Sequence, residues 1–182
     1  MKKIYIPLLL LFVIVAALTE QGCDILNNLF LDQALKQTIE TTGNNSDIQN
    51  SKPFCLSDYD AIDDNIDNIV SITYVSAAYF TESYSEGLTG QNIVATLYAG
   101  DGVTVIWQVT IPFGVASDYV NNPYEIVLTP EQVAAFNSYL ANYENDDCYI
   151  AELIVQNVND NDGPPFSLTG RVEIVVQMEI QP

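Results

Sequence analysis

The sequence predicts a mainly β protein, namely a small antiparallel β-sandwich of the immunoglobulin-like (Ig-like) kind with one short helical crossover and an N-terminal tether. Three observations favour this class. Apolar and polar residues alternate with period two in several segments, turn residues separate these segments, and a single segment carries the signature of a helix start. Strands that are apolar on one face must bury that face, which six or so strands achieve by packing as two sheets.

The strongest alternation lies in residues 103–111 and 171–180, where every second residue is apolar. The rows expected to face the core are Val103, Val105, Trp107, Val109 and Ile111 in the first segment, and Val172, Ile174, Val176, Met178 and Ile180 in the second. Further strands, rich in β-branched and aromatic residues, are expected at 69–80, 93–99, 124–128 and 149–158. Gly100-Asp101-Gly102 predicts a tight hairpin, because glycine accepts the positive φ that such turns require.

One helix is expected after the strand at 124–128. Thr129 supplies an N-cap hydroxyl, Pro130 occupies the first turn, where no N–H is needed, and Gln132 is placed to complete a capping box. The helical face expected to pack on the core is formed by Val133, Phe136 and Leu140.

The first residues have the pattern of an export signal. Lys2 and Lys3 give a positive start, and residues 4–18 form an apolar run broken only by Pro7. A helix across a bilayer needs about 20 apolar residues, so this run is short for a membrane anchor.

The Gly22-Cys23 step that follows resembles the cleavage box of bacterial lipoproteins, over the first two dozen residues only. The resemblance implies that Cys23 is acylated and becomes the N-terminus of the mature protein. Glu20 and Gln21 depart from the aliphatic and small residues that are usual in that box. The alternative is ordinary signal-peptide cleavage after Ala17 or Thr19, which leaves Cys23 as a plain thiol.

These features divide the chain into a signal peptide (1–22), a lipid-anchored tether that is partly helical or disordered (23–50), and the β-sandwich domain (51–182). The chain has three cysteines, and an odd count in an exported protein leaves one to be explained. If Cys23 carries lipid, Cys55 and Cys148 can form a disulfide in an oxidising compartment. Their Cα atoms are then expected about 4.4 to 6.8 Å apart.

The charge of the mature chain is strongly negative. Removal of residues 1–22 takes away Lys2, Lys3 and Glu20, which leaves 3 basic and 23 acidic residues and changes the net charge from −19 to −20. Such a surface repels phosphate backbones, so nucleic acid is excluded as a partner. The chain has no histidine, which excludes catalysis by Ser-His-Asp or Cys-His sets and zinc sites built on imidazole.

Two acidic segments are candidate calcium sites, because calcium prefers oxygen ligands. Segment 58–67 contributes Asp60, Asp63, Asp64 and Asp67, and segment 157–163 contributes Asp160 and Asp162. The second segment is not an EF-hand, because the glycine comes one residue late and the bidentate acid is missing. The alternatives are a solvated helix face for the first segment and a plain connecting loop for the second.

Tyrosines on water-facing strand positions could bind sugar rings or a protein partner, although aromatic residues in strands are more often packing residues. The candidates are Tyr79, Tyr84, Tyr98, Tyr119 and Tyr124. The leading hypothesis is a non-catalytic lipoprotein that is tethered to a membrane of the bacterial cell envelope, on its periplasmic or outer side, and binds an envelope protein or glycan. A calcium-dependent glycan-binding module is the alternative, and a hydrolase that uses only carboxylates is third.

Overall fold

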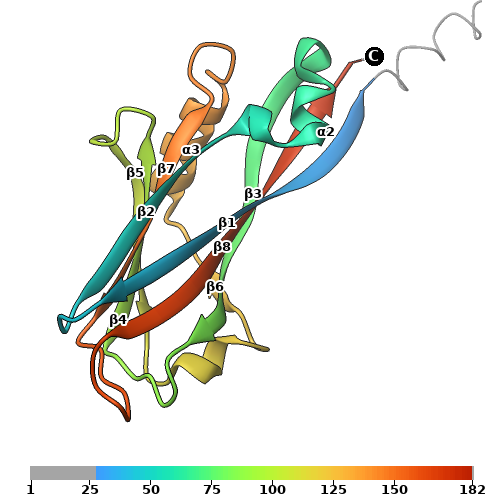
Figure 1. Cartoon of the computed structure of the whole chain (residues 1–182). Helices are drawn as coiled ribbons and strands as arrows, with labels where there is room; N and C mark the ends of the chain where they lie inside the picture. The colour runs from blue at the N-terminus through green and yellow to red at the C-terminus, as the bar shows by residue number, and fades with distance from the viewer. Residues whose placement is uncertain (1–27, 182) are drawn as a thin grey trace, which may run out of the picture.

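The computed structural model describes residues 28–181 (Figure 1), so the signal peptide and Cys23 lie outside the described residues. The strands are β1 (Leu29–Gly43), β2 (Ile48–Cys55), β3 (Ile69–Tyr84), β4 (Asn92–Ala99), β5 (Val105–Pro112), β6 (Tyr124–Ile126), β7 (Cys148–Gln156) and β8 (Phe166–Ile180). The helices are α2 (Asp60–Asp63) and α3 (Pro130–Leu140), and the 3₁₀ turns are η2 (Leu56–Asp58), η3 (Ile66–Asn68) and η4 (Ala116–Tyr119). None of the helices in this part of the chain is long and apolar enough to span a membrane.

The eight strands form two four-stranded antiparallel sheets, ordered β1-β8-β3-β6 and β2-β7-β4-β5. The pairs β1–β8, β2–β7, β3–β6 and β4–β5 are nested, as if one long hairpin had been folded over on itself. Buried apolar residues of both sheets belong to one hydrophobic cluster. The architecture is therefore a β-sandwich with the nested pairing of a jelly roll.

The Ig-like expectation is wrong, and so is the tether over the part of residues 23–50 that the structure describes. In an immunoglobulin domain the first two strands are neighbours in one sheet, whereas β1 and β2 lie in different sheets here. All of β1 and the first three residues of β2 fall in the segment expected to be a tether, and β1 occupies residues for which a helix was considered. The domain of the described chain therefore begins at Leu29, about twenty residues before the expected boundary at 51.

Buried polar side chains explain why β1 lacks a clear sequence signature. Leu35 and Ile39 face the core, but Gln37 and Thr41 occupy inward positions of the same row and are also buried. The Thr41 hydroxyl donates to the Leu168 carbonyl (2.9 Å), and the Gln37 amide donates to the Tyr59 hydroxyl (2.7 Å). These hydrogen bonds satisfy the Thr41 hydroxyl and one N–H of Gln37, whereas Gln37 Oε1 has no partner among the described residues. Both side chains interrupt the apolar alternation that predicts a strand.

The other expected strands are confirmed, but in one of them the side chains expected to face the core do not all do so. The inward row of β8 is buried from Val172 to Ile180, as the alternation predicted. Trp107 of β5 is buried as expected, but Val105 of β5 is 50% exposed and Val103, in the turn before β5, is 79% exposed. The pairing with β4 shifts here: Leu97 is opposite Trp107 and Tyr98 is opposite Val105, which leaves Ile106 as the bulged residue of β5 and changes the facing of the residues before it.

The predicted turn and helix are also confirmed. Gly102 has a φ of +69°, and the Asp101 carboxylate accepts hydrogen bonds from the backbone N–H groups of Val103 and Thr104. Thr129 and Gln132 form the capping box of α3, which crosses from β6 in one sheet to β7 in the other. Phe136 and Leu140 are buried and Val133 packs against the core.

Candidate functional site

The acidic segment between β2 and β3 does not gather its carboxylates into a metal-binding group. Asp60, Asp63, Asp64 and Asp67 are all exposed, while Ile62 beneath them is fully buried. Within residues 28–181, the group of cysteine and carboxylate side chains that lie close enough to share an ion is a different one, described below. The arrangement is that of a solvated helix face.

The second acidic segment is a connecting loop between β7 and β8. The Asp160 carboxylate accepts hydrogen bonds from the backbone N–H groups of Asp162 (3.1 Å) and Gly163 (2.6 Å). Gly163 has a φ of +78°, and the Asp162 side chain is exposed. Asp160 therefore holds its own loop, and the two carboxylates do not form a ligand cluster in the described residues.

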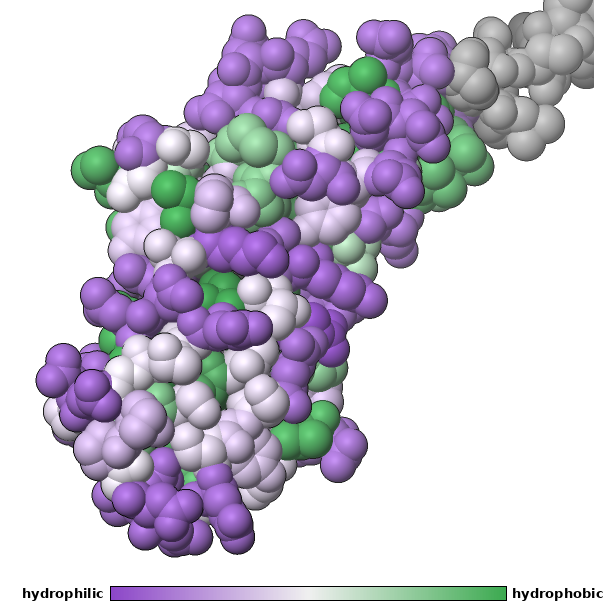
Figure 2. Space-filling view, viewed as in Figure 1, coloured by the Kyte–Doolittle hydropathy of each residue, from purple (hydrophilic) through white to green (hydrophobic). Residues whose placement is uncertain are grey.

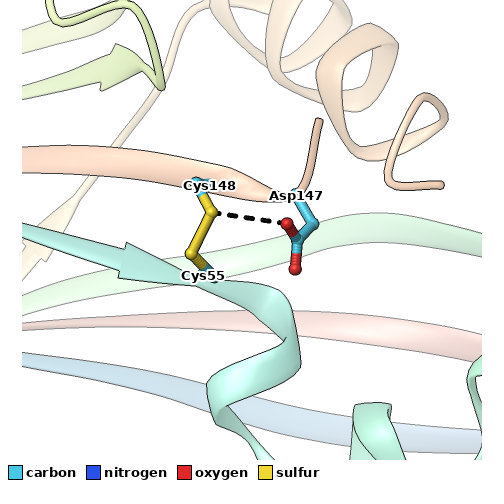
Figure 3. Close-up of side chains that lie close together, drawn as sticks. All are labelled: Cys55, Asp147 and Cys148. Carbon is cyan, nitrogen blue, oxygen red and sulfur yellow. Dashed lines mark hydrogen bonds between the residues drawn. A yellow bond between two sulfur atoms is a disulfide. The ribbon is translucent and has the colours of Figure 1, made fainter. Parts of the chain in front are cut away.

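The close group consists of Cys55, Asp147 and Cys148 (Figure 3). Cys55 and Cys148 form a disulfide, as expected, with an S–S distance of 2.02 Å. Their Cα atoms are 3.9 Å apart, closer than the expected range, and the two residues are direct partners in the β2–β7 ladder.

Hydrogen bonds to Asp147 hold the segment that follows Cys55. The carboxylate of Asp147 accepts hydrogen bonds from the Ser57 hydroxyl (2.6 Å) and backbone N–H (3.1 Å), and its carbonyl accepts one from Leu56 N (2.8 Å). The other carboxylate oxygen lies 3.4 Å from Cys148 Sγ. Metal ions bind thiolates rather than disulfide sulfurs, so the group is a structural clamp and not a metal centre.

The tyrosines expected to face water divide into two sets. Tyr79 is fully buried and its hydroxyl lies 3.2 Å from the Thr81 hydroxyl, so the expectation was wrong for this residue. Tyr119 packs edge-on between Tyr79 and Tyr124, with ring centroids 5.9 and 5.8 Å away. Burial raises the pKa of Tyr79 and, less strongly, that of Tyr119. Three of the five candidates are therefore largely packing residues.

Tyr98 lies on the water-facing side of β4, on the outer face of the sheet β2-β7-β4-β5. Its hydroxyl donates to the Glu152 carboxylate (2.9 Å), and this hydrogen bond is the main cause of the raised pKa of Tyr98. Thr96 stands between Glu152 and Gln108 in the ladder, and the Gln108 amide donates to its hydroxyl (3.0 Å). We call Tyr98, Glu152, Thr96 and Gln108 the Tyr98 face.

Half-buried aliphatic residues border the Tyr98 face: Ile150, Ile154 and Val94. An aromatic ring beside a carboxylate and an amide offers both a stacking surface and hydrogen-bonding groups, whereas Thr96 is 1% exposed and its hydroxyl only supports the Gln108 amide. Sequence analysis missed Glu152, Thr96 and Gln108. The alternation of their strands places Glu152 and Gln108 on the outer face, but only the register places the three residues in one row.

The outer face of the other sheet carries an ion-pair network. Arg171 contacts the carboxylates of Glu82 (2.7 Å) and Glu173, and its guanidinium lies 4.0 Å from the centroid of the Phe80 ring. Lys36 lies 3.8 Å from the Glu173 carboxylate. Two of the three basic side chains in residues 28–181 are therefore paired with acids on this face.

The two ends of the described chain lie at one end of the sandwich, next to α2 (Figure 1). Gln181 N donates to the Asn68 carbonyl (2.9 Å), which fixes the C-terminal end beside η3. The β1–β2, β3–β4, β5–β6 and β7–β8 loops lie at the opposite end, which we call the loop end.

Comparisons with known proteins give little further information. Neither the protein-family models nor the curated proteins match the chain. Among solved structures, 85% of the chain is similar to 83% of a chain of Desmodium yellow mottle tymovirus (TM-score 0.41, 7% identity). It is also similar to 82% of a chain of turnip yellow mosaic virus (0.37, 9%) and 54% of one of Macrobrachium rosenbergii nodavirus (0.39, 12%). These TM-scores are too low to support any functional argument.

Proposed function

We propose that the protein is a non-catalytic lipoprotein of the bacterial envelope, tethered outside the cytoplasm by lipid on Cys23, that binds an envelope protein through its loop end. The export signal and the Gly22-Cys23 step support the anchor. The first strand, β1, starts at Leu29, six positions after Cys23, and six extended residues span at most about 20 to 22 Å. A lipid on Cys23 would thus hold the domain close to the membrane.

The observation that carries this proposal is the position of the chain ends. Because residue 28 and Gln181 lie at the same end of the sandwich, an anchor on the N-terminal side leaves the loop end pointing away from the membrane. Loops that are held by a rigid scaffold are common binding surfaces.

Hydrogen bonds between the loops support a preformed binding surface. Thr89 and Asn159 exchange backbone hydrogen bonds (2.7 and 3.0 Å), and Val158 N donates to the Ser46 carbonyl (2.7 Å). Ala116 N donates to the Leu88 carbonyl (3.0 Å), which joins the β5–β6 loop to the same group. A preformed surface loses less conformational entropy on binding, which favours affinity.

Fractionation of cells that export the full chain tests the anchor. We expect the wild-type protein in the membrane fraction, with an intact mass that includes acyl chains on Cys23, and the Cys23→Ser variant in the soluble fraction. One acyl chain binds membranes only marginally, whereas two or more anchor stably. An unmodified mass for a chain that starts at Leu18 or Glu20 would overturn the anchor.

Matched charge insertions test the binding surface. Val115 lies in the β5–β6 loop and is 42% exposed, whereas Val103 lies at the opposite end and is 79% exposed. We expect Val115→Arg to abolish cross-linking to the envelope partner and Val103→Arg to leave it unchanged. Equal loss in both variants, or in neither, would contradict binding at the loop end.

The Tyr98 face favours a second candidate function, the binding of a glycan, because a tyrosine ring beside Glu152 and Gln108 suits a hydroxyl-rich sugar. We expect Tyr98→Ala to weaken binding to soluble envelope polysaccharide at least tenfold and Tyr84→Ala, at an exposed tyrosine of β3, to leave it unchanged. Titration with calcium chloride alone, followed by calorimetry, tests calcium dependence, for which the described carboxylates offer no gathered ligand set. No observation favours the carboxylate-only hydrolase.

A further inference from the structure

Three large apolar side chains are exposed together where the described chain begins. Leu29 and Phe30 of β1 are 53% and 57% exposed, and Val70 of β3 is 53% exposed. Figure 2 shows hydrophobic surface at this end of the molecule. We call Leu29, Phe30 and Val70 the tether-side corner.

The sheet register places these residues at the same end of neighbouring strands, with Leu29 and Phe30 projecting to opposite faces of the sheet because they are consecutive in β1. Leu29 and Phe30 are opposite Ile180 and Glu179 of β8, and the same two residues are opposite Ile69 and Ser71 of β3. Val70 lies in the bulge between Ile69 and Ser71. Neighbouring strands are about 4.8 Å apart, so the corner spans roughly 10 Å across three strands.

We propose that the tether-side corner inserts into the interfacial region of the membrane that holds the lipid of Cys23. This inference rests on the proposed acylation of Cys23. Leu29 is six positions after Cys23, so the corner lies within about 20 to 22 Å of the acylated residue. Apolar side chains that reach the boundary between headgroups and acyl chains bury their surface there, about 5 to 10 Å deep.

The charges around the corner fit a zwitterionic lipid surface. Asp32 and Asp67 are exposed beside it, and the Glu179 carboxylate accepts hydrogen bonds from Asn28 and from the Ser71 hydroxyl (3.1 Å). Carboxylates at this place oppose contact with anionic headgroups. The corner is therefore suited to phosphatidylcholine- or phosphatidylethanolamine-rich lipid more than to anionic lipid.

The edge of β1 gives a reason to prefer lipid over a second copy of the chain. Side chains already bond its outward carbonyls: Gln33 donates to Ala34 (2.9 Å), Tyr59 to Lys36 (3.4 Å) and Asn50 to Glu40 (2.7 Å). Strand addition requires a row of free backbone groups. These three side-chain bonds interrupt the row of free backbone groups along β1, which makes this edge a poor one for pairing with another strand.

Tryptophan quenching in vesicles tests the proposal. The acylated full chain would be reconstituted in dioleoylphosphatidylcholine vesicles that contain brominated phosphatidylcholine, with Phe30→Trp as probe and Val127→Trp, at a 74% exposed site away from the corner, as matched control. Trp107 is buried and gives a constant background. We expect the fluorescence of Phe30→Trp to be quenched more than that of the parent protein, and Val127→Trp to show no such extra quenching. At low salt, the addition of phosphatidylglycerol should reduce the quenching of Phe30→Trp.

Flotation of the vesicles separates this proposal from the anchor itself. If the protein floats with the vesicles but Phe30→Trp is not quenched, the corner does not insert and the inference is overturned while the anchor stands. If sedimentation instead shows dimers that form as the concentration rises and that cover Phe30, a second copy of the chain occupies the corner. That result also overturns the inference. If the wild-type protein does not float, the anchor has failed as well.

Discussion

Tyr149 illustrates how a single buried group affects stability in this protein. Its ring packs against Phe54 and Phe136, with centroids 5.6 and 6.0 Å away, and the residue is 1% exposed. Its hydroxyl has no hydrogen-bond partner among the described residues. A buried hydroxyl without a partner costs about 1 to 3 kcal/mol of desolvation.

We therefore expect Tyr149→Phe to leave the free energy of unfolding at pH 7 unchanged or to raise it by about 1 kcal/mol. Urea unfolding followed by circular dichroism measures this value. Tyr84→Phe, at an exposed tyrosine, is the control and should have no effect. A loss of more than about 1 kcal/mol for Tyr149→Phe would show that the hydroxyl has a stabilising partner.

The same residue predicts a dependence of stability on alkaline pH. Burial raises the pKa of Tyr79 and Tyr149 far above the value near 10 of an unfolded tyrosine. Above about pH 10 the unfolded chain releases protons that the folded chain retains, so the free energy of unfolding falls as pH rises. The slope is up to about 1.4 kcal/mol per pH unit for each such tyrosine.

Unfolding series between pH 8 and 11.5 check this sign. Tyr149→Phe removes one of the two strongly shifted groups and should make the decline shallower, whereas Tyr84→Phe should not. A wild-type stability that is constant or rises between pH 10 and 11.5 is incompatible with buried, protonated tyrosines in the core.

At the scale of secondary-structure elements, the clamp between β2 and β7 is the main covalent feature. The disulfide joins the last residue of β2 to the first residue of β7, and β2 is an edge strand of its sheet. Asp147 and Ser57 hold the segment that leaves β2 at the same place. The clamp therefore fixes both the edge of the sheet and the start of the acidic segment.

We expect the double variant Cys55→Ala/Cys148→Ala to lower the free energy of unfolding by about 2 to 4 kcal/mol, because the bridge constrains residues that are 93 positions apart. Urea unfolding measures the loss, with Cys23→Ser as the control that leaves the bridge intact. Thiol labelling of the folded, unreduced wild-type domain should modify neither Cys55 nor Cys148. Labelling of both, or a loss below about 0.5 kcal/mol, would show that the bridge does not form in the exported protein.

For the whole molecule, the strongly negative net charge of −19 dominates the electrostatics. Since Lys36 and Arg171 are already paired with carboxylates, the folded chain repels itself more than the expanded unfolded chain does. Salt screens this repulsion over a Debye length of about 10 Å at 0.1 M. The few exposed ion pairs that salt also weakens contribute little, about 0 to 1 kcal/mol each.

Raising sodium chloride from 10 to 300 mM should therefore increase the free energy of unfolding, by about 1 kcal/mol. Calcium chloride at the same ionic strength is the matched control, and an extra increase with calcium would indicate specific binding. Stability that falls with sodium chloride would mean that local ion pairs outweigh the general repulsion.

The sequence by itself determined the elements with a strong local signal. The alternation of β8, the Gly100-Asp101-Gly102 turn and the capping box at Thr129 each rely on neighbours in sequence, so their structures follow from backbone and side-chain preferences alone. The pairing of Cys55 with Cys148 followed from the cysteine count, once Cys23 was set aside.

Only the tertiary structure decided which strands pair and which polar side chains they bury. Gln37 and Thr41 gain their hydrogen bonds from Tyr59 and Leu168, which are distant in sequence, so β1 was concealed and the domain was placed too late in the chain. The jelly-roll order depends on eight strands that nest across two sheets. The Tyr98 face and the tether-side corner likewise depend on register, because side chains from separate strands meet only when long-range backbone pairing sets their positions.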